Sequence, residues 1–384
     1  MKDHAFRSWQ SAVSARAAKV LWVLRLVTVN LIIFAVLAEL ASLVLVRLDR
    51  WPSTRPTYHL DYNRFWADIS PVFGAWHRPN GSFVHQIGCF SAVYTTNSYG
   101  ARDVERTLRS SSPRTIVLGD SFVEGFGLSD EERLTNVLER ETGREHLNFG
   151  TSGAFSPLQY ALLYESLAAE FDHDQVLVGV LPGNDLYEMD PSWVPEGRYR
   201  PVYGSDLSIE YQGTFDPDAG ERFADRLEAI LRAYFASYHV GQYVHSRTRW
   251  YRLVSYSAFN DFSDADLERL ETALLRIKRT ADAHGSAMGV YLIPRADDFV
   301  RFASTGADRL GPLMERFGEE VGIRVKDLLP EMAARSGGDY RPYFFTCDGH
   351  WSPHGSATAA SIVLEWLRDR ASTGAPLPGG EVGR

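Results

Sequence analysis

The sequence predicts an α/β protein: an open, parallel sheet covered by helices on both faces, preceded by one membrane-spanning helix. Two observations predict this fold. Between residues 114 and 370, short apolar runs alternate with helical segments, as in a parallel sheet whose strands are buried. Near the N-terminus, residues 26–46 are apolar on nearly every face, which is typical of a helix in a bilayer.

The composition is that of a folded, acidic protein. The 384 residues are 45% hydrophobic, 12% aromatic and 23% charged, enough apolar surface to offset the entropy of ordering a large core. The formal net charge of −9 argues against a nucleic-acid partner, because such proteins need a basic surface that displaces counterions. Cys89 and Cys347 are the 2 cysteines; they cannot build a disulfide scaffold or a cysteine-based zinc site, but they can form one long-range bridge.

Residues 26–46 read LVTVNLIIFAVLAELASLVLV and predict the membrane-spanning helix. A helix of this length measures about 31 Å at roughly 1.5 Å per residue, enough to cross the hydrocarbon core. A buried core helix is one alternative, but such a helix usually has a polar stripe. A cleaved signal peptide is another, but its apolar region is shorter and no A-x-A cleavage site follows this segment. We therefore predict an uncleaved signal anchor.

The flanks of this segment predict its orientation. Residues 1–25 form a short basic tail and the folded mass follows the span, which favours a cytoplasmic N-terminus and a periplasmic or external domain. In that oxidising compartment a Cys89–Cys347 disulfide is plausible. Glu39 is discordant within the apolar segment, and we expect it to reach the interface, to stay protonated or to contact another membrane protein.

The elements after the span are predicted in chain order. Residues 51–113 form a lead-in segment that packs on the following domain, and the alternation from Ser82 to Thr96 predicts strands or a hairpin. The domain itself covers 114–370, and a flexible tail, 371–384, follows it. The five buried strands are predicted at 114–119, 146–150, 175–181, 287–293 and 323–327. The helices are predicted at about 129–142, 158–171, 263–284, 307–321 and 355–370.

Residues 190–260 are too long for a simple crossover and predict an aromatic-rich insertion. Its aromatic residues are expected to pack an inserted subdomain; the alternative is a lid or a surface that stacks on sugars.

Chemically capable residues follow the predicted strands at the edge where open parallel sheets bind ligands. Ser121 follows the first strand in the sequence GDSF, at a turn into a helix. The second strand leads into 148–153 (NFGTSG), where Gly153 can point a backbone N–H into a pocket. The third is followed by Asn184 in the sequence PGND. Asp348 and His350 lie together on the loop before the last helix.

Each of these motifs is weak alone, but together they supply what acyl transfer needs: a hydroxyl, a base held by a carboxylate, and donors for an oxyanion. Asp120 is expected to order its turn and Asp185 to hydrogen-bond its own loop. We predict no metal and no cofactor, because His350 and His354 are four residues apart with no third ligand in view.

At these motifs the sequence resembles the SGNH (GDSL-type) hydrolases, in GDSFVEGFG (119–127), NFGTSG (148–153), GND (183–185) and CDGHWSPHG (347–355). The lead-in 95–103 resembles that of membrane-anchored members. The resemblance implies a flavodoxin-like sheet of strand order 2-1-3-4-5 and ester hydrolysis without a metal. The family commonly has Asp three residues before His, where this chain has Cys347. Asp348, two before His350, resembles the D-x-H form of polysaccharide O-acetylation proteins.

The expected roles follow. Ser121 attacks an ester carbonyl, His350 takes its proton and Asp348 orients the imidazole, with His354 as a lower-ranked rival base. The backbone N–H groups of Ser121 and Gly153 and the Asn184 amide are expected to bind the oxyanion.

The leading prediction is a serine esterase or deacetylase acting on an acylated small molecule or a cell-surface glycan. An O-acyltransferase that moves an acetyl group to a polysaccharide would use the same triad. A non-catalytic glycan-binding module is the third possibility; such a module would be expected to lack the Ser, Asn or His, and all three are present.

Overall fold

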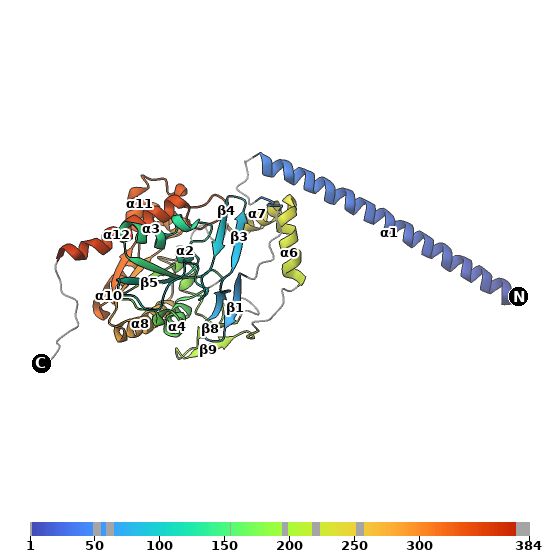
Figure 1. The fold of residues 1–384 in the computed structure, drawn as a ribbon. Coiled ribbons are helices and arrows are strands. Elements are labelled where there is room, and N and C mark those ends of the chain that lie inside the picture. Colours follow the sequence, from blue (N-terminus) through green and yellow to red (C-terminus); the bar gives the residue numbers. More distant parts are fainter. Residues whose placement is uncertain are drawn as a thin grey trace.

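The computed structural model describes residues 2–48, 55–58, 65–153, 155–193, 199–216, 223–250 and 257–373. A long N-terminal helix projects from a folded domain built around one sheet (Figure 1). The predicted tail 371–384 lies outside the described residues, apart from its first three residues, which extend the last helix.

The central sheet has five parallel strands: β5 (Arg114–Gly119), β6 (Glu145–Gly150), β7 (Gln175–Val180), β10 (Ala287–Leu292) and β11 (Arg324–Asp327). Their order is β11-β10-β7-β5-β6, so the predicted order 2-1-3-4-5 is confirmed. Apolar side chains fill the strands because helices cover both faces, and no predicted strand boundary is off by more than one residue. The α/β fold class is thus confirmed.

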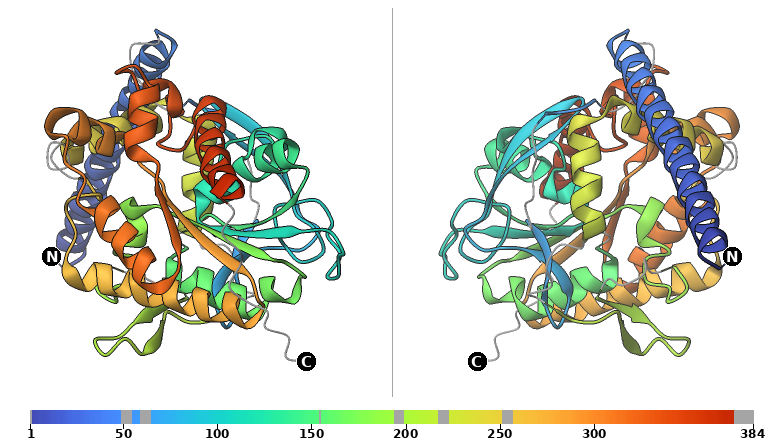
Figure 2. Two further views of the ribbon diagram at one scale, coloured as in Figure 1. Left: turned by 90° about the vertical axis from the view of Figure 1, so that its left-hand side faces the viewer. Right: turned by 90° about the vertical axis from the view of Figure 1, so that its right-hand side faces the viewer.

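Helices pack on both faces of the sheet (Figure 2). On one face α4 (Pro157–Ser166) packs against α8 (Asp264–Ala283), and on the other α3 (Leu134–Thr142) packs against α12 (Pro353–Thr373). Ser263, the predicted start of the long helix, is the N-cap of α8, and its hydroxyl accepts the backbone N–H of Asp266.

Some predicted helix boundaries are wrong. The helix predicted at 129–142 starts as a 3-10 turn, Asp130–Glu132, and the one predicted at 158–171 ends at Ser166, before a second 3-10 turn. Helix α10 (Leu310–Val321) begins three residues later than predicted. Two short helices, α9 (Ala296–Thr305) and α11 (Leu329–Arg335), were not predicted, because seven to ten residues give too little periodicity to separate from loop.

The lead-in segment forms two antiparallel pairs beside the domain. Strand β1 (Trp66–Ser70) pairs with β2 (Gly74–His77), and β3 (Ser82–Ile87) pairs with β4 (Phe90–Thr95), which confirms the predicted hairpin. Arg102, fully buried, donates to the backbone carbonyls of Glu124, Gly125 and Leu128. The lead-in therefore holds the loop that follows β5.

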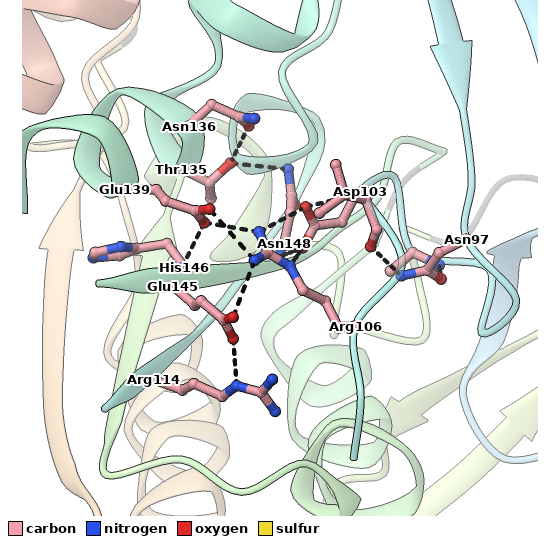
Figure 3. Close-up of polar contacts among 12 residues, drawn as sticks. Asn97, Asp103, Arg106, Arg114, Thr135, Asn136, Glu139, Glu145, His146 and Asn148 are labelled. Carbon is pink, nitrogen blue, oxygen red and sulfur yellow. Dashed lines mark hydrogen bonds and ion pairs between the residues drawn. The ribbon is translucent and has the colours of Figure 1, made fainter. Parts of the chain in front are cut away.

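A buried polar network fastens the lead-in to the edge strand β6 (Figure 3). Arg106 donates to Asp103 and to Glu139 of α3, at 3.1 and 2.7 Å. Asp103 in turn accepts the backbone N–H of Asn148 at 3.3 Å. The side-chain amide of Asn148 donates to the carbonyl of Val123, at 3.0 Å. Asn148, the first residue of the NFGTSG motif, therefore links strand β6 both to the lead-in and to the segment that follows β5.

The insertion contains β8 (Arg200–Tyr203), β9 (Ile209–Gln212), α6 (Phe223–Tyr234) and α7 (Ala236–Trp250). The rings of Tyr199 and Tyr211 stack at 5.4 Å, and their hydroxyls donate to the carbonyls of Pro71 and Val72. These two tyrosines hold the β8–β9 hairpin on the lead-in, whereas Trp193 and Tyr234 of the insertion are 47% and 45% exposed.

Helix α1 (Lys2–Arg47) contains the predicted span and extends it in both directions. Its Lys19–Arg47 portion is long and apolar enough to cross a membrane. The Glu39 carboxylate accepts the backbone N–H groups of Ala236 and Ser237, at 2.7 and 3.0 Å. None of the three expectations for Glu39 foresaw this contact, because its partner is the N-terminus of α7 in the same chain.

Candidate active site

Ser121 lies at the sharp turn from β5 into α2 (Ser121–Glu124). Asp120 begins this helix as its N-cap, accepting the N–H of Phe122 at 2.9 Å, so the expectation that Asp120 orders the turn is confirmed. The turn needs glycine at Gly119, since a Cβ there would lie 2.3 Å from Cγ2 of Val123. The sequence therefore folds so that Ser121 stands beyond the carboxyl end of the strand.

His350 reaches Ser121 from the loop before α12. Its Nε2 lies 2.7 Å from the Ser121 Oγ, and its Nδ1 contacts the Asp348 carboxylate. Because a carboxylate only accepts, Nδ1 carries the proton and Nε2 is left to accept the serine proton. His354, the rival base, lies on α12 with its ring against Tyr343. The structure therefore brings Ser121, His350 and Asp348 together.

The Asp348 carboxylate is held as an anion. Burial alone would raise its pKa, but the hydrogen bonds and charge of His350 outweigh burial and lower the pKa below the usual value. The backbone N–H of His350 also donates to Asp348, at 2.8 Å. The D-x-H spacing thus closes a small ring in which one carboxylate oxygen fixes both backbone and side chain of the histidine.

Aromatic side chains sandwich the His350 imidazole, and sequence analysis missed them. Phe126 stacks on the imidazole at 4.1 Å between ring centroids and 21° between planes, and Phe122 lies at 4.9 Å. Behind Phe126 stands His85 of β3, at 4.5 Å. Burial lowers the pKa of His85 to about 4, so this second histidine is a neutral packing group.

A disulfide joins Cys89, in the β3–β4 turn, to Cys347, beside Asp348, with a Cα–Cα distance of 5.7 Å. Next to it, Phe90 and Phe345 pack at 4.9 Å. The bridge left open by the sequence is thus present, and it fastens the histidine loop to the lead-in hairpin. Cys347 stands three residues before His350, where the SGNH hydrolases that the sequence resembles commonly have Asp.

Asn184 lies on the short helix α5 (Pro182–Asp185), beyond β7. Its amide donates to Asp120 at 3.3 Å, which connects the third strand end to the serine turn. Burial raises the pKa of Asp120 to about 6. Asp185 accepts the Leu181 N–H and the Tyr160 hydroxyl, both at 2.8 Å, so its predicted role within its own loop is confirmed.

The glycine motif after β6 lies against the serine turn. The N–H of Thr151 donates to the Gly119 carbonyl at 3.3 Å, and a Cβ on Gly150 would lie 2.3 Å from the Glu124 nitrogen. Gly153 has a φ of 104°, a conformation that favours glycine. The loop therefore approaches α2 closely only because it is built from small residues.

A buried carboxylate, Glu124, lies at the far end of α2 and was missed by sequence analysis. It accepts from Trp66 at 2.9 Å, from His77 at 3.0 Å and from the Ser152 hydroxyl. Burial alone would raise its pKa, but His77, Arg102 and Ser152 together lower it to about 2. Glu124 therefore joins the lead-in, the serine turn and the glycine loop; a charged residue within an apolar motif was the available signal.

Within the described residues, no group of three or more His, Cys, Asp or Glu side chains could hold a metal ion.

No protein-family model matches the chain, and no curated protein matches its sequence. Several solved structures are similar to it. A lipase/acylhydrolase from Enterococcus faecalis is 12% identical, with 67% of this chain and 96% of that chain covered and a TM-score of 0.36. A member of the lipolytic G-D-S-L family from Veillonella parvula is 11% identical, covering 67% and 99%, with a TM-score of 0.38. A carbohydrate esterase family 2 enzyme with a carbohydrate-binding domain from Corynascus is 10% identical, covering 70% and 69%, with a TM-score of 0.37. Identities and TM-scores this low assign no activity to the chain.

Proposed function

We propose that the chain is a serine esterase that removes acyl groups from ester-linked substrates through an acyl-enzyme intermediate. One observation carries the proposal: the Ser121 hydroxyl, the His350 imidazole and the Asp348 carboxylate are in hydrogen-bond contact in that order. A hydroxyl is a weak nucleophile until a base takes its proton, and the base works only in the correct tautomer. The Asp348 contact selects that tautomer.

The first half-reaction acylates the enzyme. The Ser121 Oγ bonds to the ester carbonyl carbon while its proton moves to Nε2 of His350, and the carbonyl π electrons move onto oxygen. The tetrahedral intermediate then collapses, the C–O bond to the alcohol breaks, and His350 returns the proton to the leaving oxygen. In the second half-reaction water replaces the alcohol, and the same steps release the carboxylic acid and free Ser121.

The oxyanion is proposed to bind the backbone N–H groups of Ser121 and Gly153 and the Asn184 side chain. An amide nitrogen carries two protons, so Asn184 can keep its bond to Asp120 and offer the second proton to substrate. The positions of these groups at neighbouring strand ends support the assignment.

The acceptor of the acyl group defines the second candidate, an O-acyltransferase. It is favoured by the D-x-H spacing of Asp348 and His350, which resembles that of polysaccharide O-acetylation proteins. We propose a glycan as the natural substrate for either reaction, and α1 as a single-pass anchor that holds the domain on the periplasmic or external side. The Cys89–Cys347 disulfide supports an oxidising compartment.

The test is an activity screen of the full chain in detergent or nanodiscs. Short-chain and long-chain esters and acetylated polysaccharides are offered, with the Ser121→Ala variant alongside. We expect ester cleavage that Ser121→Ala abolishes, while an equally folded Ser121→Ala protein that retained turnover would refute the mechanism. Adding a non-acetylated glycan separates the two candidates: acyl transfer to the glycan indicates the transferase, and release of free acid indicates the esterase.

A further inference from the structure

Helix α6 carries large apolar side chains on a side that the rest of the described chain leaves exposed. Phe223, Leu227, Ile230 and Tyr234 recur at intervals of four, three and four residues, so they share one side of the helix. Their exposed fractions are 81%, 45%, 37% and 45%, and that of the adjacent Phe235 is 41%. The first four residues, Phe223, Leu227, Ile230 and Tyr234, are called the α6 apolar face below.

The other sides of α6 carry small residues and charged residues. Ala229 is half-buried and Ala233 is buried. Glu228 and Arg232 form an exposed ion pair at 2.9 Å. The helix thus has a small-residue side against the protein, a charged side toward water and a large apolar side. A contiguous exposed apolar surface bordered by charge marks a binding surface.

The chain just after α6 is hydrogen-bonded to Glu39 of α1. Glu39 accepts the backbone N–H groups of Ala236 and Ser237, the first residues of α7. Ala236 comes two residues after Tyr234, where α6 ends. The C-terminal end of the α6 apolar face therefore lies at the level of Glu39 along α1.

The exposure of α1 changes at the same level. Every side chain from Lys19 to Leu37 is exposed, whereas Ser42 and Val46 are buried, and this later part of α1 packs on α7. At about 1.5 Å per residue, the exposed stretch measures roughly 28 Å, close to the roughly 30 Å hydrocarbon core of a bilayer. It begins seven residues before the predicted span 26–46, and its two charged residues, Lys19 and Arg25, have side chains long enough to reach toward the interface. The side chains that contact only lipid in a membrane would thus end just before Glu39.

We propose that the α6 apolar face lies on the lipid bilayer that α1 crosses, at the depth of Glu39, an inference that rests on the membrane anchoring proposed above. The ribbon views support it: α6 lies on the side of the domain from which α1 projects (Figures 1 and 2). An amphipathic helix with aromatic residues on its apolar side and charges on another is suited to the interface. The domain then has two attachments, α1 and α6, which fix its orientation relative to the membrane.

Accessibility of spin labels tests this placement in the full chain, reconstituted in nanodiscs of phosphatidylcholine and phosphatidylglycerol. Cys89 and Cys347 are the only cysteines and are joined, so one introduced cysteine is the only free thiol. Labels go on the apolar face (Leu227→Cys, Ile230→Cys), on the charged side of the same helix (Glu228→Cys), and on α8 (Arg279→Cys), which lies away from α1 in Figure 1.

If the α6 apolar face lies on the bilayer, spin labels at 227 and 230 collide with oxygen several-fold more often than with a water-soluble nickel complex. Labels at 228 and 279 collide more often with the nickel complex. Equal access of the nickel complex to all four labels would overturn the proposal. Labels at 227 and 230 that are immobile and shielded from both reagents would also overturn it, in favour of a protein partner or a second copy. Hydrolysis of a soluble ester by the same variants is measured in parallel, so failure of the esterase proposal is read independently.

Discussion

The surroundings of Ser121 and the surface of α6 place apolar side chains in opposite ways. Around Ser121, Phe122 and Phe126 point inward and pack on His350, and the charge of Glu124 is fully buried and paired. On α6 the large apolar groups of the α6 apolar face are exposed, and the small Ala233 is buried. The first arrangement fixes a geometry within the chain, whereas the second is complete only with something outside it. Substitutions should therefore affect catalysis and stability in the first region and membrane contact in the second.

The largest difference between the regions is expected for His350→Gln. Glutamine cannot take the serine proton, so turnover of a soluble ester should fall at least about 10³-fold, as when other serine hydrolases lose their base. The matched variant Leu227→Gln should retain the parental rate in detergent. Steady-state kinetics measures both rates. Comparable losses in the two variants would contradict the separation of a catalytic region around Ser121 from a membrane-contact surface on α6.

Asn184→Ala comes next. Removing one oxyanion donor should lower kcat by about 10² to 10³-fold and leave KM nearly unchanged, because the bond forms mainly in the transition state. Kinetics on a short acyl ester measures this. A rise in KM alone would instead assign Asn184 to substrate binding.

Glu124→Gln probes stability in the same region. Leaving His77 without its carboxylate in the interior should lower the free energy of unfolding by about 3 kcal/mol at pH 7, measured by urea titration. The pKa of Glu124 is lowered from its ordinary 4.5 to about 2, so its contribution is complete above pH 4.5 and is lost as the pH falls toward 2.

The deficit of Glu124→Gln should accordingly shrink over that pH range. The exposed Glu141→Gln serves as control and should change stability by less than about 0.5 kcal/mol. A Glu124→Gln deficit that stayed constant down to pH 2 would contradict the charged, paired carboxylate.

Phe126→Ala should have the smallest effect. Without the stacked ring the imidazole gains freedom, and kcat should fall about 10-fold while the Ser121 hydroxyl stays reactive. Phe126→Leu, which restores volume but no stacking, should recover part of the rate. An unchanged kcat in Phe126→Ala would show that Asp348 alone orients the histidine.

The apolar runs sufficed to predict the five strands of the sheet, because buried parallel strands are apolar with glycine or polar residues at their ends. Their order came from the resemblance to the SGNH hydrolases. The sequence also predicted that Ser121, Asp348 and His350 act together, because a strand-end serine and an Asp/His pair are the groups that acyl transfer needs. Phe126 and Glu124 could not be predicted. Their partners, His350 and His77, are distant in the chain, and nothing local separates a stacking phenylalanine from a core one.

For the α6 apolar face, too, the sequence does not show what the side chains contact. Periodicity predicts that a helix has an apolar side, but not whether protein or lipid covers it. Likewise, Glu39 was recognised as out of place, but its partner, the N-terminus of α7, required the fold. Sequence therefore located the atoms of the proposed chemistry more readily than the contacts that hold them.

The central claim is that folding makes Ser121 a nucleophile, and an active-site probe tests this most directly. The full chain is treated with a fluorophosphonate and digested with trypsin, and the peptide 115–133 that contains Ser121 is analysed by mass spectrometry. The account predicts a single adduct on Ser121, abolished in His350→Gln although Ser121 is retained. Ester hydrolysis by a chain whose Ser121 stays unmodified at saturating probe would contradict it.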